Sequence, residues 1–208
     1  MERNFDSAAA LSFAWRALRE YGVFIFIIFG IYILLLFAIF ILIVVSQLLI
    51  IDIILIFIAI LFIPSFPIII ISKMLYIYDI GKVPYRMLFL GLRDYFHFTL
   101  TFYILLLMTF SGLVIFVFPG LYIFSRFFIA PFLVLDRKWE GKGAIFESVG
   151  ITASLSLLRH SAIFFLINFV GLILAGLGLF VSIPFSLAYI TYIYRQVKLS
   201  PAKRVFEK

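Results

Sequence analysis

The stretch that decides the fold runs from Pro119 to His160 and reads PGLYIFSRFFIAPFLVLDRKWEGKGAIFESVGITASLSLLRH. It contains an apolar helix, a basic elbow and an amphipathic helix that ends in Leu-Arg-His. The same order of parts occurs three times, because the Leu-Arg pairs that begin at Leu18, Leu92 and Leu158 each close an amphipathic segment and open a long apolar run. These pairs lie 74 and 66 residues apart. We therefore predict a chain built from three copies of one unit.

The composition places the chain in a membrane. Of its 208 residues 66% are hydrophobic and 13% are charged, and the mean hydropathy is +1.26. Soluble domains have about half apolar and a quarter charged residues. The first apolar run, residues 22–45, is too long for the core of a signal peptide and is predicted to span the membrane. The chain has no cysteine, which excludes disulfides and thiolate chemistry within it.

The fold class that we predict is an all-α integral membrane protein in one polytopic domain, residues 1–208. It has six transmembrane helices arranged as three repeated hairpins, each preceded by a cytoplasmic amphipathic helix. A spanning helix needs roughly 20 apolar residues. The predicted spans are about 22–45, 50–72, 96–118, 120–136 and 161–176, and a sixth span follows residues 176–178 and runs to about Tyr194. The repeat units are about 7–80, 83–140 and 143–198, and a basic tail covers 199–208.

The three amphipathic segments are expected to hold their apolar stripes toward the membrane and to lie in the headgroup plane. For the first, residues 5–20, a soluble capping helix is the alternative. The predicted stripes are Ala8, Leu11, Trp15 and Leu18 in the first segment, Tyr85, Leu88 and Leu92 in the second, and Phe146, Val149, Ala153 and Leu157 in the third, which covers residues 144–159.

Proline and glycine mark the expected bends. Pro64 and Pro67 predict a kink near Ser65, which neighbouring helices must support by satisfying the carbonyls that proline frees. Residues 119–120, Pro-Gly, predict the turn between the third and fourth spans. Residues 73–82 are expected to carry the chain out of the membrane. Gly171 and Ala175 are spaced for close helix contact within the bundle.

The basic residues predict the topology. The three hairpin tips, near Gln47, Pro119 and Leu177, contain no Lys or Arg, whereas the N-terminus, the two elbows and the tail contain 16 of the 17. Cytoplasmic loops are the ones enriched in Lys and Arg. Both termini are therefore predicted to be cytoplasmic, in a membrane that is expected to be the bacterial inner membrane.

Arg126 is the exception and the one clear charge inside a predicted span. It lies seven residues after Pro119, which is roughly 10 Å along a helix. A charge at that depth normally faces the bundle interior or water and has a partner. Asp52, Tyr122 and carbonyls freed by the helix prolines are the candidate partners. A structural clamp, an anion-binding site and a snorkelling side chain all remain open.

No catalytic arrangement is apparent in the sequence. His97 and His160 have no second ligand at metal-binding spacing on their own helices, and we interpret them as polar residues of helix interfaces. The chain contains no phosphate-binding glycine loop and no hydrolase or metalloprotease motif. We predict no enzyme, no cofactor and no metal site.

Several short motifs resemble a large bacterial family. These are Ala14-Trp15 with residues 18–21, Leu-Arg-Glu-Tyr, then residues 81–84, Gly-Lys-Val-Pro, and residues 119–122, Pro-Gly-Leu-Tyr, followed by Arg126, Ala130-Pro131 and Asp136. The chain resembles the YciC-like six-helix membrane proteins and the membrane domain attached to some glycerophosphodiester phosphodiesterases. His160 and Ser161 stand where this pattern usually has a tryptophan near Leu158. The resemblance implies a multipass inner-membrane protein and no catalytic residues.

The function that we expect is non-enzymatic binding or organisation of lipid at the cytoplasmic leaflet. The net charge of +7 favours anionic lipid headgroups over nucleic acid, because the basic residues are not gathered on a soluble domain. The expected contacts for an anionic lipid or solute are Arg126, facing a cavity between hairpins, with Lys73, Arg19, Arg93 and Arg159. The alternatives are a transporter or channel subunit for a small solute and a membrane anchor for a lipid-metabolising protein partner.

Overall fold

The computed structural model describes residues 6–46, 48–81, 91–152, 158–173 and 178–199. Within these ranges the chain is all-helical and contains no strand. The helices are α1 (Ser7–Ser46), α2 (Leu49–Phe62), α3 (Ser65–Ile80), α4 (Leu92–Ile115), α5 (Val117–Phe127), α6 (Ala130–Arg137), α7 (Gly141–Thr152), α8 (Leu158–Ile173) and α9 (Leu179–Leu199).

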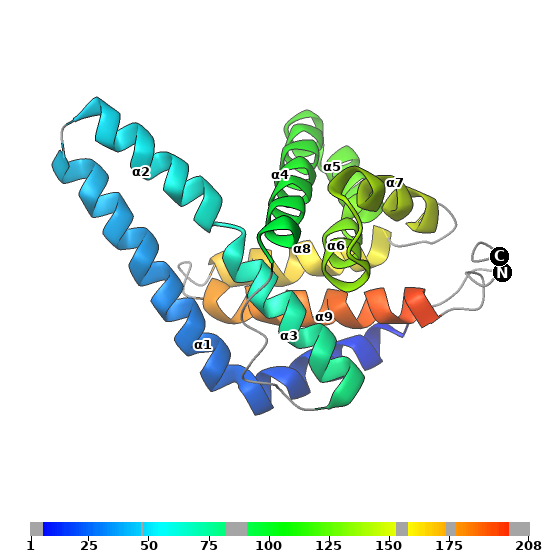
Figure 1. Cartoon of the computed structure of the whole chain (residues 1–208). Helices are drawn as coiled ribbons and strands as arrows, with labels where there is room; N and C mark the ends of the chain where they lie inside the picture. Colours follow the sequence, from blue (N-terminus) through cyan, green and yellow to red (C-terminus); the bar gives the residue numbers. More distant parts are fainter. Residues whose placement is uncertain (1–5, 47, 82–90, 153–157, 174–177, 200–208) are drawn as a thin grey trace.

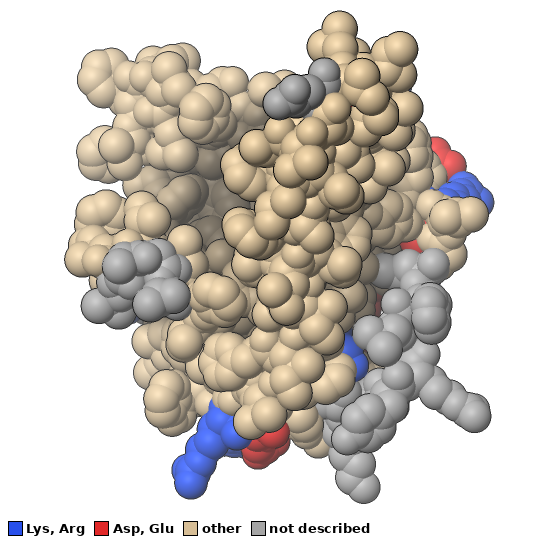
Figure 2. Space-filling view, turned by 90° about the vertical axis from the view of Figure 1, so that its left-hand side faces the viewer, with Lys and Arg blue, Asp and Glu red and all other residues tan. Residues whose placement is uncertain are grey.

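Four stretches of the described chain are long and apolar enough to cross a membrane: Ser7–Ser46, Leu49–Ile80, Leu92–Ile115 and Val117–Arg137. Helix α8 is apolar but shorter. The chain is therefore an all-helical protein with the helices of an integral membrane protein. The surface is consistent with this, because the described residues on the face shown in Figure 2 are mostly uncharged, and the charged side chains in view lie toward its lower and right-hand parts.

Helix α9 forms the centre of the bundle. Helices α1, α3 and α8 all pack against it, and most of its side chains from Ser182 to Val197 are buried. The α1–α2 hairpin extends away from this centre, while α4 to α7 lie on another side of it (Figure 1). The N-terminal part of α1 runs along α9 through a buried face of small residues, Ser7, Ala10, Ala14 and Ala17.

The predicted kink near Ser65 is confirmed, since α2 ends at Phe62 and α3 begins at Ser65. Proline has no N–H, so Pro64 leaves the carbonyl of Ile60 without its helical donor. The Tyr103 hydroxyl of α4 donates to that oxygen, and the nearby carbonyls of the kink also receive tyrosine hydroxyls. Tyr95 donates to the oxygen of Leu61, and Tyr32 donates to the oxygen of Ile63 at 2.8 Å. Neighbouring helices thus stabilise the kink.

Two expected ends of helices are wrong. The turn after α4 lies at Phe116, which is extended at φ −161° and ψ 155°, and not at residues 119–120. Pro119 is the third residue of α5, where a missing N–H costs nothing because the first N–H groups of a helix have no intrahelical acceptor. At the other end of the bundle, Lys73 does not begin a loop, because α3 continues to Ile80.

The first amphipathic segment is not a separate helix, contrary to expectation. Residues 7–20 are continuous with the first span in α1, and Leu11 and Trp15 of their predicted stripe are exposed while the alanine face is buried. In α7, Phe146 of the predicted stripe is 76% exposed, and the buried face consists of Gly141, Ala144, Ser148 and Thr152. The second segment, apart from Leu92, lies outside the described residues, as do Gln47, Ala153, Leu157, Ala175, Leu177 and residues 200–208.

Candidate functional site

Three helices end at a buried arginine. Arg195 near the end of α9 is 5% exposed, and its Nη1 donates to Asp136 of α6 at 2.9 Å. Its Nη2 pairs with Asp79 of α3. The Tyr194 hydroxyl donates to the second oxygen of Asp136 at 2.6 Å. The last turns of α3, α6 and α9 are therefore joined by one ionic cluster, which we call the arginine junction (Asp79, Asp136, Tyr194 and Arg195).

Other polar contacts bring further helix ends to the same place. Lys138, just after α6, pairs with Asp94 in the first turn of α4. Arg93 pairs with Glu140 at 2.9 Å across the same elbow. The Tyr21 hydroxyl of α1 contacts the carbonyl of Gly81 after α3 at 3.4 Å. These contacts define the charged end of the molecule, where α4 begins, α3, α6 and α9 end, and α1 passes.

Helices α3 and α6 end in the same way. Gly81 adopts φ 73° and Lys138 adopts φ 57°, and each is the left-handed C-cap two residues after the aspartate that binds Arg195. A left-handed C-cap is common at helix ends, but it is normally glycine. Lys138 is the one non-glycine residue with positive φ among those described. The two helices thus present equivalent aspartates to the junction.

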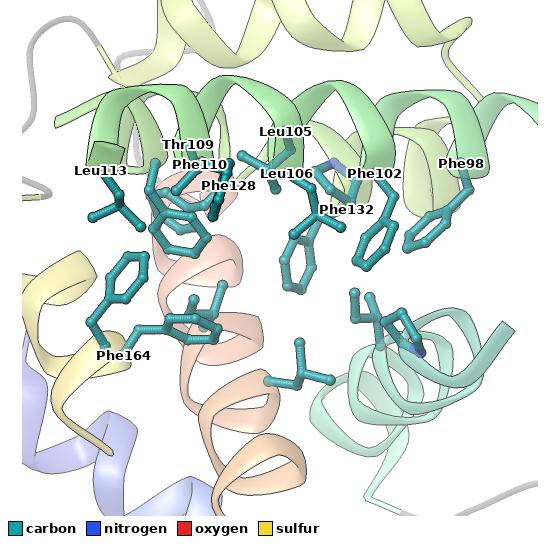
Figure 3. A pocket seen from close by; sticks show the side chains of 17 residues that line it. Phe98, Phe102, Leu105, Leu106, Thr109, Phe110, Leu113, Phe128, Phe132 and Phe164 are labelled. Atoms are coloured by element: carbon teal, nitrogen blue, oxygen red, sulfur yellow. The ribbon is translucent and has the colours of Figure 1, made fainter. Parts of the chain in front are cut away.

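An apolar cavity of about 270 Å³ lies between α3, α4, α5, α6, α8 and α9 (Figure 3). We call it the phenylalanine cavity, because eight of its 17 lining residues are phenylalanines and only Thr109 has a polar side chain. Its lining consists of Pro67, Ile71, Phe98, Phe102, Leu105, Leu106, Thr109, Phe110, Leu113, Phe124, Phe128, Pro131, Phe132, Phe164, Phe165, Leu187 and Ile190. Such a lining can hold hydrocarbon but offers no charge to a polar ligand.

The cavity and the arginine junction share a wall. The ring of Phe132, which lines the cavity from α6, stacks on the ring of Tyr194 with centroids 5.2 Å apart. Tyr194 in turn binds Asp136 through its hydroxyl. The buried tyrosine therefore separates an apolar compartment from an ionic cluster, and it can do so because it has an apolar ring and a polar tip.

Four of the five predicted anion contacts fall into two groups. Arg19, Arg93 and Arg159 are exposed, in α1, α4 and α8. Lys73, in contrast, is 3% exposed, and its Nζ lies 4.3 Å from the centre of the Phe24 ring. Helix α3 thus packs the Lys73 side chain against α1, and its contact with a headgroup stays a prediction.

Arg126 is not among the residues that line the phenylalanine cavity. Its guanidinium lies 5.9 Å from the ring of Tyr122, one of the expected partners, and within the described residues it forms no ion pair. Asp52 is bound instead by the Ser46 hydroxyl at the α1–α2 tip. The backbone of Arg126 has clearer partners, because its carbonyl accepts hydrogen bonds from Ser148 at 2.8 Å and from Thr152 at 3.1 Å. Helix α7 thus satisfies a carbonyl at the end of α5.

The histidines lie at helix interfaces. His160 is buried, with its Nδ1 2.7 Å from the Tyr189 hydroxyl of α9. The Nδ1 of His97 is 3.5 Å from the backbone nitrogen of Gly141. No group of three His, Asp or Glu residues that could hold a metal occurs among the residues that the structure places.

Sequence reasoning missed both the arginine junction and the phenylalanine cavity. The sequence did carry a signal for the junction, since Asp79, Asp136 and Arg195 each stand near the end of the second span of a predicted unit. The cavity carried none, because phenylalanines that line it and phenylalanines that face outward occur in the same apolar runs. Comparisons of the chain with protein-family models, curated proteins and solved structures found no match in any of the three.

Proposed function

We propose that this chain is a six-span inner-membrane protein that binds anionic lipid at its charged end and catalyses no reaction. The observation that carries the proposal is the position of Arg19 and Arg159. Both are exposed in α1 and α8, and neither forms an ion pair among the described residues. Cations beside apolar helices attract anionic headgroups, at about 1 kcal/mol for each Lys or Arg near the surface.

The direction of the helices supports six spans. Helix α4 begins at the charged end and α6 returns to it, while α1 leaves near Tyr21 and α3 returns at Gly81. The contact between His160 and Tyr189 places the start of α8 about one and a half turns from Arg195, where α9 returns. The proposed topology therefore has three hairpins, with both termini and the charged end in the cytoplasm.

The arginine junction supports the three-unit repeat. The second spans of the units would end at Asp79, Asp136 and Arg195, and Arg195 binds both aspartates. This is the arrangement expected if the units are related by a pseudo-threefold axis along the membrane normal. Arg195 would then be the position at which the third unit supplies the cation for the carboxylates of the other two.

The proposal is tested with nanodiscs that contain equal amounts of phosphatidylglycerol and phosphatidylcholine. Native mass spectrometry of the released protein should show more bound phosphatidylglycerol, and the double variant Arg19→Gln with Arg159→Gln should lose most of that preference. Arg126→Gln is the matched control, because Arg126 lies away from the charged end in α5. Equal retention of the two lipids by the unmodified protein would overturn the proposal.

A transporter or channel subunit and an anchor for a lipid-metabolising partner are the alternative functions. The phenylalanine cavity gives a small polar solute no charged side chain among the described residues, so it does not favour transport. Saturable solute uptake into proteoliposomes would nevertheless establish a transport function. An anchor would be recognised by a stoichiometric protein partner after mild detergent extraction.

A further inference from the structure

We propose that the phenylalanine cavity is a binding site for one hydrocarbon chain of a membrane lipid. This site is separate from headgroup binding at the charged end and would stand even if Arg19 and Arg159 bound no anion. The shape of the cavity, the chemistry of its lining and the position of its opening all support such an occupant.

The lining of the cavity along α4 is long enough for a lipid chain. Along α4 its lining extends from Phe98 to Leu113, 15 residues apart, which corresponds to roughly 22 Å of helix. One leaflet contributes about half of the 30 Å hydrocarbon thickness of a bilayer. The volume of about 270 Å³ is at or below the lower limit of sites for drug-sized molecules, about 300 to 1,000 Å³. A single chain therefore fits better than a whole lipid or a fused-ring molecule.

The lining also excludes other occupants. Water in a cavity needs two to four polar partners, and the described lining offers one polar side chain, Thr109. The Thr109 hydroxyl is itself buried and has no hydrogen-bond partner within the described part of the chain. An anionic headgroup would find no cation among the lining residues. Hydrocarbon is the one component of the bilayer that needs neither a hydrogen-bond partner nor a cation.

The cavity opens toward the outside of the bundle. Leu106 and Phe110 line it and are also exposed, so the slot meets the surface along α4. At its inner wall, Phe128 and Phe132 are 3% and 2% exposed. Lipid around the protein can touch the first pair but reaches the second only from inside the cavity. Contact of a lipid with Phe128 or Phe132 therefore distinguishes a chain bound in the cavity from lipid that only surrounds the protein.

Photo-crosslinking tests the proposal. The full chain is placed in nanodiscs of phosphatidylglycerol that carries a diazirine in the middle of one acyl chain, irradiated and analysed by peptide mass spectrometry. We expect cross-links at Phe132 and at exposed residues of α2 such as Ile53. Leu106→Trp should fill the slot and abolish the cross-link at Phe132 while leaving those on α2 unchanged.

Two matched variants keep the test decisive. Leu107→Trp adds the same ring one residue further along α4, at a residue that is 69% exposed and does not line the cavity, and it should retain the Phe132 cross-link. Thr109→Val removes the hydroxyl without changing volume and should also retain it. The proposal is overturned if Phe132 is unlabelled in the unmodified protein, if Leu106→Trp leaves its labelling unchanged, or if Thr109→Val abolishes it.

Discussion

The α1–α2 and α4–α5 hairpins have similar apolar sequences but pack very differently. At Gly112 of α4 a Cβ atom would lie 2.8 Å from the Cα of Gly120, so the two backbones are in direct contact. The far half of the α1–α2 hairpin has no such contact: α2 has no buried residue, and a Cβ atom added at Gly30 of α1 would meet no atom within 4 Å. The α8–α9 hairpin resembles the α4–α5 hairpin, because Gly171 and Gly178 meet in the same way.

This difference shows that apolar character does not decide packing in this protein. Lipid tails are as apolar as leucine, so helices in a bilayer associate through close packing of small residues and through hydrogen bonds. Helix α2 consists almost entirely of Ile, Leu and Phe, yet its contacts are mainly with α1. The hairpins with paired glycines, by contrast, belong to the body of the bundle.

The largest loss of stability is expected at the arginine junction, which joins the body of the bundle to the base of the α1–α2 hairpin. Arg195→Met removes the buried cation that binds Asp136, whose side chain is 12% exposed, and breaking a buried pair costs about 3 to 5 kcal/mol. Arg126→Met removes the same charge from the last turn of α5, where a cation contributes about 1 kcal/mol or less. Reversible unfolding in mixed micelles should separate the two variants, and equal losses would show that the junction is not a structural centre.

A smaller effect is expected from filling the glycine contact. Gly112→Ala must move α5 away from α4, and overpacking of this kind costs about 1 to 3 kcal/mol. Gly30→Ala meets no atom within 4 Å and should be neutral or slightly stabilising, since alanine favours a helix over glycine. The same unfolding measurement applies. If both substitutions were neutral, the contrast between the two hairpins would not come from glycine packing.

A still smaller loss of stability is expected when the tyrosine hydroxyl that supports the kink between α2 and α3 is removed. Tyr103→Phe removes the hydroxyl that binds the Ile60 carbonyl, and hydrogen bonds between membrane helices contribute about 0.6 kcal/mol on average. Pro64→Ala restores the N–H that this carbonyl lacks. Tyr103→Phe should therefore cost less in the Pro64→Ala background, and a double-mutant cycle measures the difference. Additive effects would mean that the tyrosine does not compensate for the proline.

The smallest loss of stability is expected when a side chain of α2 is truncated. Ile53→Ala changes a side chain that is 58% exposed and should leave the unfolding free energy nearly unchanged. Ile70→Ala, on the same run of chain in α3, removes a fully buried side chain and leaves a void in the bundle. A loss at Ile53 as large as that at Ile70 would indicate that another protein surface covers α2.

The sequence was sufficient to predict the helical membrane class and the kink at Pro64, because both follow from local composition and from the missing N–H of proline. It could not show which tyrosines support the kink, since Tyr32 and Tyr103 are distant from Pro64 along the chain. It misplaced the turn at residues 119–120 because proline is equally suited to the first turn of a helix as to a turn before it.

The candidate site was harder to predict, for a different reason. The amphipathic pattern of α7 indicates which apolar side chains leave water, but it does not show that Ser148 and Thr152 are buried against the Arg126 carbonyl, which accepts hydrogen bonds from both. Arg126 was singled out for its isolation in an apolar run, whereas Arg195 stood among charges expected at a membrane surface. Only the folded chain shows that Arg195 is buried between two carboxylates, and only it shows which phenylalanines enclose a cavity.

Labelling of single cysteines tests the three-hairpin topology most directly, because the chain has no cysteine of its own. Cysteines replace three residues at the charged end, Ile80, Glu140 and Arg159, and three at the far ends of the helices, Leu48, Phe116 and Ile173. A maleimide that cannot cross the membrane should label the first three from the cytoplasmic side and the last three from the opposite side. If Arg159→Cys and Ile173→Cys react from the same side, α8 does not cross the membrane and the six-span account is wrong.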